Sequence, residues 1–511
     1  MARVGGHLFI INGDLTKVAC DALLVPTDKN FRVEAPWRAL VRGHKIPEKW
    51  GSKRVIALPA SDKEPQVWLG NVGQLGDGSD FSVFAPTVES FVVQAADKLR
   101  SAKHKRIYDW PKPRLALNVV GSGLGGGSAK KGSLIRGLIE KLTTLADEID
   151  VDIILVTYGP KPYAAAQRAR RRYVQKESRT WRFHPKANPD LIREAHRLAE
   201  EAIERHLVLF IGAGVSAGAG VPAWKELLEV LAAETEFDDE TRAQLAEKDL
   251  RDQATLIESE LARRGIRMRK MVSAALREYR RYSLTHGLLA SLPSKEAVTT
   301  NFDNLFETAY KSRGRRLAVL PDNPRKTDGH WLLKLHGSVE RPDEIILTRS
   351  DYLSMPRQYG ALMGLVQGLL LMRRMVFVGY SLSDEDFHEL IDEVRAARGD
   401  TDIGRGVALT LFSDPLDEKL WEKDLDIVPM VTSPRISVPV AARELELFLD
   451  LVGYLSTSSA SFFLDSTYSD LSDSEAELRD ALAQLAVKTG GSPVDSVGHL
   501  VEMFLRDHLG A

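Results

Sequence analysis

Glycines crowd one short loop in the middle of the chain, directly after an apolar run of strand length. The stretch reads HLVLFIGAGVSAGAGVPAW, residues 206–224, and a helical pattern, KELLEVLAAE, follows it. Glycines let a pyrophosphate approach the backbone, and the free N–H groups at a helix start attract an anion. The pattern predicts a dinucleotide site, although a tight turn alone would also favour glycines. The small residues are Gly212, Ala213, Gly214, Ser216, Gly218 and Gly220.

The loop differs from the fingerprint of dinucleotide-dependent dehydrogenases. It lacks the G-x-G-x-x-G spacing, and no acidic residue stands plainly about 20 residues further on, where a ribose-binding carboxylate is expected. Hydride transfer is therefore not expected.

Polar or small residues also follow three further apolar runs of strand length. Ligands of an open α/β sheet bind outside the carboxyl ends of its strands, so we expect these residues and the glycine loop at one edge. A histidine bonded to backbone and a turn-forming asparagine are the structural alternatives. The residues are Asn301 and Asp303 in TTNFDN, His336 in KLHGS, and Gly379 and Ser381 in FVGYSLSD.

Alternating strand and helix patterns surround these residues and predict an α/β fold in two parts. The first part covers residues 1–165, and the second covers 190–454 with a helical insertion at about 225–290. The stretch 166–189 is basic without a clean apolar period and predicts a linker, while 455–511 predicts a helical tail. The expected strands lie at 8–11, 21–26, 114–120 and 152–158, and at 208–211, 297–300, 332–335, 375–380 and 407–412.

The composition is that of a soluble globular protein. The chain has 511 residues, of which 44% are hydrophobic and 27% charged, and its formal net charge is -2, which favours neither nucleic acid nor an acidic membrane. The N-terminus makes a poor signal peptide, and no apolar run reaches the roughly 18 residues that span a bilayer. Cys20 is the single cysteine. These features predict a cytoplasmic protein without disulfides.

Four motifs in this order resemble the sirtuin fold family: GAGVSAGAGVPAW, TTNFDN, KLHGS and FVGYSLSD. The resemblance covers about residues 205–415. It implies a Rossmann-like domain with a parallel sheet that binds NAD and cleaves its glycosidic bond to nicotinamide.

The resemblance also implies a role for each matching residue. Asn301 would contact the nicotinamide ribose and position a water, Asp303 would hold the carboxamide, and His336 would be the general base. The pyrophosphate would lie on Gly212, Ala213, Gly214 and Ser216, the nicotinamide beside Pro222 and Trp224, and a phosphate or the adenosine ribose on Gly379 and Ser381.

The chemistry agrees with these residue types. Nicotinamide leaves NAD as a neutral molecule, so the step needs no acid, and its transition state resembles an oxocarbenium ion. A base with a pKa near neutrality suits proton removal from an attacking water or ribose hydroxyl.

Departures from the family pattern distinguish two activities. Protein deacylases of the family hold a structural zinc with two cysteine pairs, and residues 339–376 contain no cysteine. We therefore expect no zinc, and no metal site of another kind. The pattern resembles instead the bacterial sirtuin-like effectors of antiphage defence, which hydrolyse NAD to ADP-ribose and nicotinamide. Such effectors commonly assemble, so the resemblance implies a homo-oligomer and allows a defence partner such as a HerA-type ATPase.

The first part of the chain resembles a macro domain. INGDLTKVACDALLVPTD, residues 11–28, matches its opening turn and strand, although Asn-Ala-Ala-Asn is absent after the second strand. GSGLGGGSAKKGSLI, residues 121–135, matches its phosphate loop, which is a good anion nest. The resemblance implies an ADP-ribose-like ligand that meets Asp14, Gly123, Gly125, Gly126 and Gly127.

Three functions remain open from the sequence. The first is an NAD hydrolase gated by a nucleotide, by assembly or by a partner. The second is an NAD-dependent deacylase or ADP-ribosyltransferase. The third is a sensor that binds NAD or ADP-ribose without turnover. For the first part of the chain, the alternative to a ligand-binding domain is a degenerate module that makes only oligomer contacts.

Overall fold

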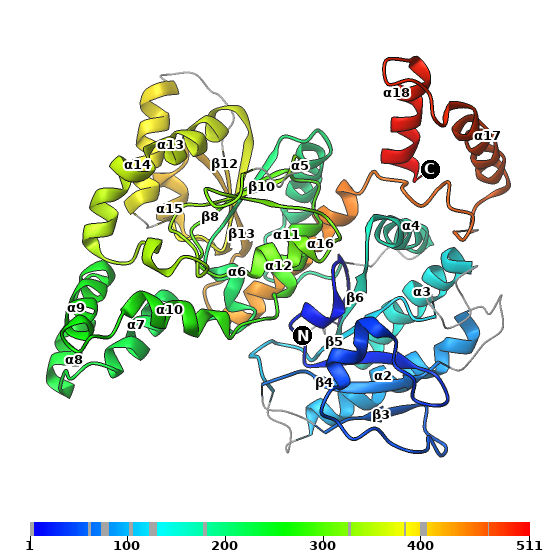
Figure 1. The fold of residues 1–511 in the computed structure, drawn as a ribbon, viewed down its shortest axis with the longest axis horizontal. Coiled ribbons are helices and arrows are strands. Elements are labelled where there is room, and N and C mark those ends of the chain that lie inside the picture. Colours follow the sequence, from blue (N-terminus) through cyan, green and yellow to red (C-terminus); the bar gives the residue numbers. More distant parts are fainter. Residues whose placement is uncertain are drawn as a thin grey trace. The chain divides into compact units, whose positions relative to one another are not determined.

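The computed structural model describes residues 5–59, 63–72, 81–101, 106–121, 130–176, 181–324, 329–382, 385–398, 406–468 and 470–510. The chain forms two compact units (Figure 1). Unit 1 consists of Met1–Pro185, Ser312–Gly314 and Gly453–Ala511, and unit 2 of Lys186–Lys311 and Arg315–Val452. Both units are α/β with sheets that are mainly or wholly parallel. The predicted α/β class with a parallel sheet is therefore confirmed, while the macro-like character of the first part stays a prediction.

The described residues of unit 1 form a six-stranded sheet in the order β1-β6-β5-β2-β4-β3. Among these strands, β3 is antiparallel to its neighbour β4, and the other pairs are parallel. The alternate side chains Leu8 and Ile10 of β1 share one buried cluster with side chains of α2, α3 and α4, so these helices cover that face. The strands are β1 Leu8–Asn12, β2 Ala22–Thr27, β3 Val55–Ala57, β4 Gln66–Asn71, β5 Arg114–Asn118 and β6 Asp152–Thr157; the helices include α1 Arg38–Val41, α2 Phe81–Arg100, α3 Lys131–Ile149, α4 Pro160–Lys176, α17 Asp473–Thr489 and α18 Val497–Phe504.

The first part of the basic stretch expected as a linker is helical. Its residues up to Lys176 belong to α4, where Ala166 and Ala169 are buried in unit 1. This apolar face was not apparent in the sequence, because many charged residues stand between its alanines. In the structure, several of these charged side chains pair with acidic residues of the C-terminal segment. The ion pairs are Lys161–Asp465, Arg168–Glu475, Arg172–Asp470 and Arg172–Glu475.

Unit 2 has a seven-stranded parallel sheet in the order β13-β12-β11-β7-β8-β10-β9. The chain builds outward from β7 to one edge and then crosses to β11 on the other side, so the sheet has its topological switch point between β7 and β11. The strands are β7 Leu207–Ile211, β8 Glu296–Thr299, β9 Ala318–Leu320, β10 Trp331–Lys334, β11 Arg374–Val378, β12 Gly406–Phe412 and β13 Leu425–Val431.

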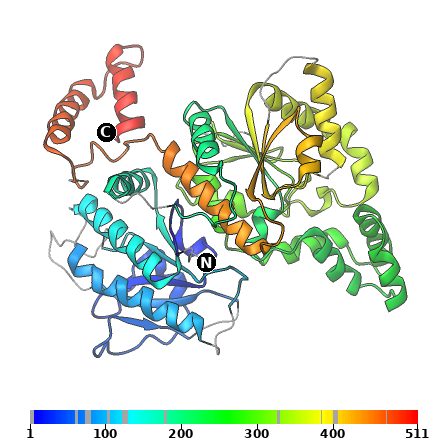
Figure 2. The same cartoon turned by 180° about the vertical axis from the view of Figure 1, so that it is seen from behind.

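The helices of unit 2 fall into two sets. Helices α5 Leu191–Ile203, α6 Gly214–Ala217, α11 Leu284–Ser291, α12 Leu305–Lys311, α13 Arg349–Met372, α14 Glu385–Arg398, α15 Pro415–Leu420 and α16 Val438–Ser456 connect or follow the strands. Figure 2 shows α16 from behind, in orange, and Thr285 of α11 donates to its Glu446. The second set is α7 Trp224–Ala233, α8 Asp239–Ala246, α9 Leu250–Arg263 and α10 Met268–Arg277, which form one group (Figure 1). Their buried apolar side chains share one cluster with Val339, Ile345 and Leu347.

None of the described helices combines the length and the apolar character that a bilayer span requires.

Candidate active site

The glycine loop after β7 packs directly against the loop after β11. The N–H groups of Gly212 and Gly214 donate to the carbonyl oxygens of Val378 and Gly379, each at 2.9 Å. A Cβ on Gly212 would lie 2.3 Å from the Gly379 oxygen, and Gly379 itself has a φ of +63°. Gly212 and Gly379 therefore serve the close approach of two loops at the switch point, while Ala213 and Gly214 are exposed.

A hydrogen-bonded group links three of the predicted site residues. The Ser216 hydroxyl, on the short helix α6, donates to Asp303 Oδ2 at 2.8 Å. Asn301 Nδ2 donates to Ser216 Oγ at 3.2 Å and to the Gly212 carbonyl at 3.0 Å. The sequence placed these residues after different strands, and the fold brings them together at the ends of β7 and β8.

The Asn301 amide has a fixed orientation and one unused acceptor. Since the Gly212 carbonyl can only accept a hydrogen bond, the group that faces it must be the NH₂. Asn301 Oδ1 is then the other arm of the amide, and it is buried with no hydrogen-bond partner among the residues that the structure describes. A buried acceptor of this kind is costly unless a water or a ligand hydroxyl donates to it.

A buried lysine supports the turn that carries Asn301 and Asp303. Lys334 Nζ donates to the carbonyl oxygens of Phe302 and Asp303, at 3.1 and 2.5 Å, and pairs with Glu307 at 2.9 Å. Its side chain is only 2% exposed. The sequence analysis missed Lys334, although a charged residue inside the apolar run LLKL was a signal for a buried partner.

His286 is a second buried residue that the sequence analysis missed. Its Nε2 lies 3.5 Å from Ser216 Oγ, and its Nδ1 faces Ser283 at the start of α11. Burial lowers the pKa of His286 to about 3, although the charge of Glu307 acts in the opposite direction. The imidazole is therefore neutral near pH 7. It supports Ser216 as a dipole rather than as a charge.

His336 leaves the sheet beside Asn301. Thr299 of β8 pairs with Lys334 of β10, and Asn301 and His336 each lie two residues beyond this pair. Gly337, with a φ of +89°, turns the chain, and the Ile346 N–H donates to the His336 carbonyl at 3.0 Å. The His336 side chain is buried, and its ring meets that of Tyr352 edge-on, with centroids 5.4 Å apart.

The other predicted residues have varied surroundings. Trp224, at the start of α7, meets the Phe302 ring edge-on at 6.0 Å, and Pro222 is half-buried. Ser381 is exposed, two residues beyond Gly379. In unit 1, Asp14 accepts hydrogen bonds from the N–H and the hydroxyl of Thr16 and so caps a short 3₁₀ turn. Gly123, Gly125, Gly126 and Gly127 lie outside the described residues.

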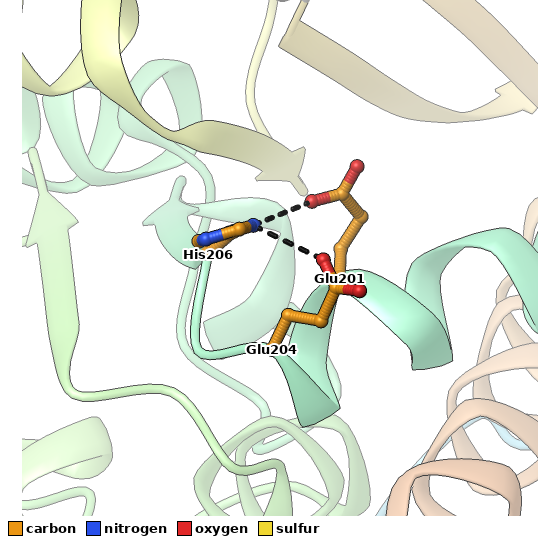
Figure 3. Close-up of side chains that lie close together, drawn as sticks. All are labelled: Glu201, Glu204 and His206. Carbon is orange, nitrogen blue, oxygen red and sulfur yellow. Dashed lines mark ion pairs between the residues drawn. The ribbon is translucent and has the colours of Figure 1, made fainter.

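A separate group of ionisable side chains lies at the end of α5. His206 Nδ1 is 3.6 Å from Glu201 Oε2 and 3.4 Å from Glu204 Oε2 (Figure 3). Imidazole and carboxylates can ligate a divalent metal. However, the Glu204 side chain is 65% exposed and that of His206 is 48% exposed, as in an ordinary solvated ion pair. We therefore assign no role to this group.

One family model matches a region that lies almost wholly in unit 2. Residues 295–430 match the family described as "SIR2-like domain". The chain is 28% identical over 208 residues to the NAD(+) hydrolase ThsA of Acinetobacter baumannii and 29% over 221 residues to that of Bacillus cereus. It is also 26% identical over 212 residues to Defense-associated sirtuin 2 of Bacillus subtilis.

These similarities cover part of each protein. They span 39%, 42% and 40% of this chain, and 41%, 44% and 21% of the respective relatives, so the chain matches less than half the length of each. The family match contains Asn301, Asp303, His336, Gly379 and Ser381. The predicted resemblance to sirtuins is therefore confirmed at the level of a SIR2-like region within unit 2.

Proposed function

We propose that unit 2 hydrolyses NAD to ADP-ribose and nicotinamide. The observation that carries the proposal is the buried, unpaired Oδ1 of Asn301, fixed next to the Ser216–Asp303 pair at the strand ends of a SIR2-like region. An acceptor in this position suits a ribose hydroxyl or the attacking water. The names of the relatives, NAD(+) hydrolase and defense-associated sirtuin, support the same activity.

The reaction balances without a further reagent. Water attacks C1′ of the nicotinamide ribose, a C1′–O bond forms, and the C1′–N bond breaks with its electron pair going to nicotinamide. Asn301 would orient the water, and His336 would accept its proton and release it to solvent. Asp303 would hold the carboxamide, and the backbone at Ala213 and Gly214, with Gly379 and Ser381, would hold the phosphates and the adenosine ribose.

The test is turnover of NAD by the purified full chain, with products separated by chromatography. We expect equimolar nicotinamide and ADP-ribose, and loss of both in His336→Ala and in Asn301→Ala. His206→Ala is the matched control, because His206 is a half-exposed histidine away from this site. A wild-type chain that binds NAD but releases no nicotinamide, with and without added ADP-ribose, would reject the hydrolase in favour of a sensor.

We further propose that the enzyme depletes NAD in an infected bacterium and that its activity is gated. A macro-like unit 1 would bind an ADP-ribose-like nucleotide through Asp14 and the glycines at 123–127, and self-assembly or a defence partner would complete the switch. Equilibrium dialysis of labelled ADP-ribose against wild type and Asp14→Ala tests the ligand. Equal binding by both proteins would remove Asp14 from the proposal.

A further inference from the structure

We infer that Tyr352 and Arg251 are positioning residues that hold the His336 imidazole, so that helices α9 and α10 control turnover at a site to which they contribute no reacting group. The inference rests on the proposed function of His336 as the base. It assigns to the helical group α7–α10 a task that neither the sequence motifs nor the family match describes, since the match begins at residue 295.

Three side chains form a row from α9 to the site: Arg251, Tyr352 and His336. The Arg251 guanidinium carbon lies 4.3 Å from the centroid of the Tyr352 ring. The Tyr352 ring in turn meets the His336 ring at an interplanar angle of 83°. An edge-on ring pair and a cation over a ring face each have a preferred geometry, so together they restrict rotation of the imidazole.

Two arginines fix the helix turn that carries Tyr352. Arg269 of α10 makes two hydrogen bonds to Asp351, at 3.0 and 2.8 Å. Arg349 of α13 bonds Asp249 and Asp252 of the α9 start. The first turn of α13 is therefore tied by hydrogen bonds to both α9 and α10.

The backbone of His336 depends on the same turn. Asp351 Oδ2 accepts hydrogen bonds from the N–H groups of Leu347 and Thr348, at 3.0 and 2.8 Å. This fixes the segment whose Ile346 N–H donates to the His336 carbonyl. Burial tends to raise the pKa of Asp351, but these N–H groups and the Arg269 charge lower it overall, so the carboxylate stays ionised. Ring and backbone of His336 are thus both held through α13.

The experiment compares variants that keep or remove the ring and the charge. Tyr352→Leu and Arg251→Met should lower kcat for nicotinamide release by about tenfold, with the KM for NAD nearly unchanged, because a shift of about 1 Å in a catalytic group costs up to about a hundredfold. Tyr352→Phe and Arg251→Lys should restore most of the rate, because they retain the aromatic face and the cation. Met372→Ala, at the far end of the same helix and 73% exposed, and Arg263→Met on α9, whose side chain is 74% exposed, are the controls.

A second readout does not require turnover. In a chain labelled at its histidines, the imidazole resonance that disappears in His336→Gln should shift in Tyr352→Leu and stay in place in the control Met372→Ala. An unshifted resonance, or full kcat in Tyr352→Leu, would overturn the inference. If the wild-type chain releases no nicotinamide but the His336 resonance still shifts in Tyr352→Leu, the hydrolase is rejected and the positioning contact is retained.

Discussion

Buried polar side chains, rather than the glycines alone, determine how the candidate site is built. Ser216 accepts from Asn301 and donates to Asp303, and this chain of bonds leaves a single amide oxygen for a ligand. The glycines of the first loop allow the backbone contact with Gly379 on which this group rests. Glycine can therefore serve two purposes in this loop, close packing of the backbone and close approach of a ligand, and the sequence pattern alone does not distinguish them.

His286 gives a prediction about pH. Its folded pKa of about 3 lies below the ordinary value of 6.5, so between these values the unfolded chain binds a proton that the folded chain does not. The contribution of neutral His286 to stability is fully present above pH 6.5. It falls by about 1.4 kcal/mol per pH unit as the pH drops toward 3.

Urea unfolding of the full chain at pH 7.5, 6.5 and 5.5 measures this slope. Wild type should lose more stability on acidification than His286→Gln, because glutamine does not titrate. Equal slopes in wild type and His286→Gln would show that His286 is not the group responsible.

At the scale of elements, the strands that carry the site were predictable. The expected runs correspond to β7, β8, β10, β11 and β12, because these strands of a parallel sheet are mostly apolar and mostly buried. The carboxyl-end rule then placed Asn301, His336 and Gly379 at one edge. The bonds among these side chains were not predictable, since they depend on distances across strands that are far apart in sequence.

Other elements escaped prediction for local reasons. β13 contains Pro429, which argues against a strand, but β13 is an edge strand, where proline is tolerated. β9 has only three residues. Helix α2 contains Pro86 close to its start at Phe81, and proline within a helix pattern argues against a helix. Within α4, the apolar face consists mostly of alanines, a weak signal between so many arginines.

The buried pair of Lys334 and Glu307 gives a prediction about β10 and α12. Lys334→Met should cost about 3 kcal/mol or more of unfolding free energy, because it leaves the Glu307 carboxylate buried without its cation. The double variant Lys334→Met/Glu307→Leu should regain most of this loss. It should not regain NAD turnover, since the carbonyl oxygens of Phe302 and Asp303 still lack their donor.

Urea unfolding and nicotinamide release on the same three proteins separate the two effects. Turnover that returns together with stability would show that Lys334 serves the fold alone. Turnover lost in both variants, with stability restored in the double one, would establish Lys334 as a positioning residue for the Asn301–Asp303 turn.

At the scale of the whole molecule, unit 1 is assembled from both ends of the chain. The segment that begins at Gly453 returns to α3 and α4 after unit 2 is complete. Phe462 and Tyr468 of this segment belong to the same buried cluster as the β1 sheet face. The charge pattern carried a signal for this closure, because a stretch rich in arginine and a segment rich in aspartate and glutamate are complementary in sign.

Apolar burial should dominate this closure, because partly exposed ion pairs contribute little. Phe462 is 4% exposed and packs beneath Arg168, whereas Phe504 of α18 is 56% exposed. Phe462→Ala should therefore destabilise unit 1 by about 3 kcal/mol, and Phe504→Ala by less than about 0.5 kcal/mol. Hydrogen exchange of α3 and α4 in the full chain measures this: faster exchange is expected in Phe462→Ala only. If exchange in α3 and α4 is unchanged in Phe462→Ala, packing of the C-terminal segment does not stabilise these helices. The ion pairs between α4 and the acidic residues that follow Phe462 would then contribute no measurable stability either.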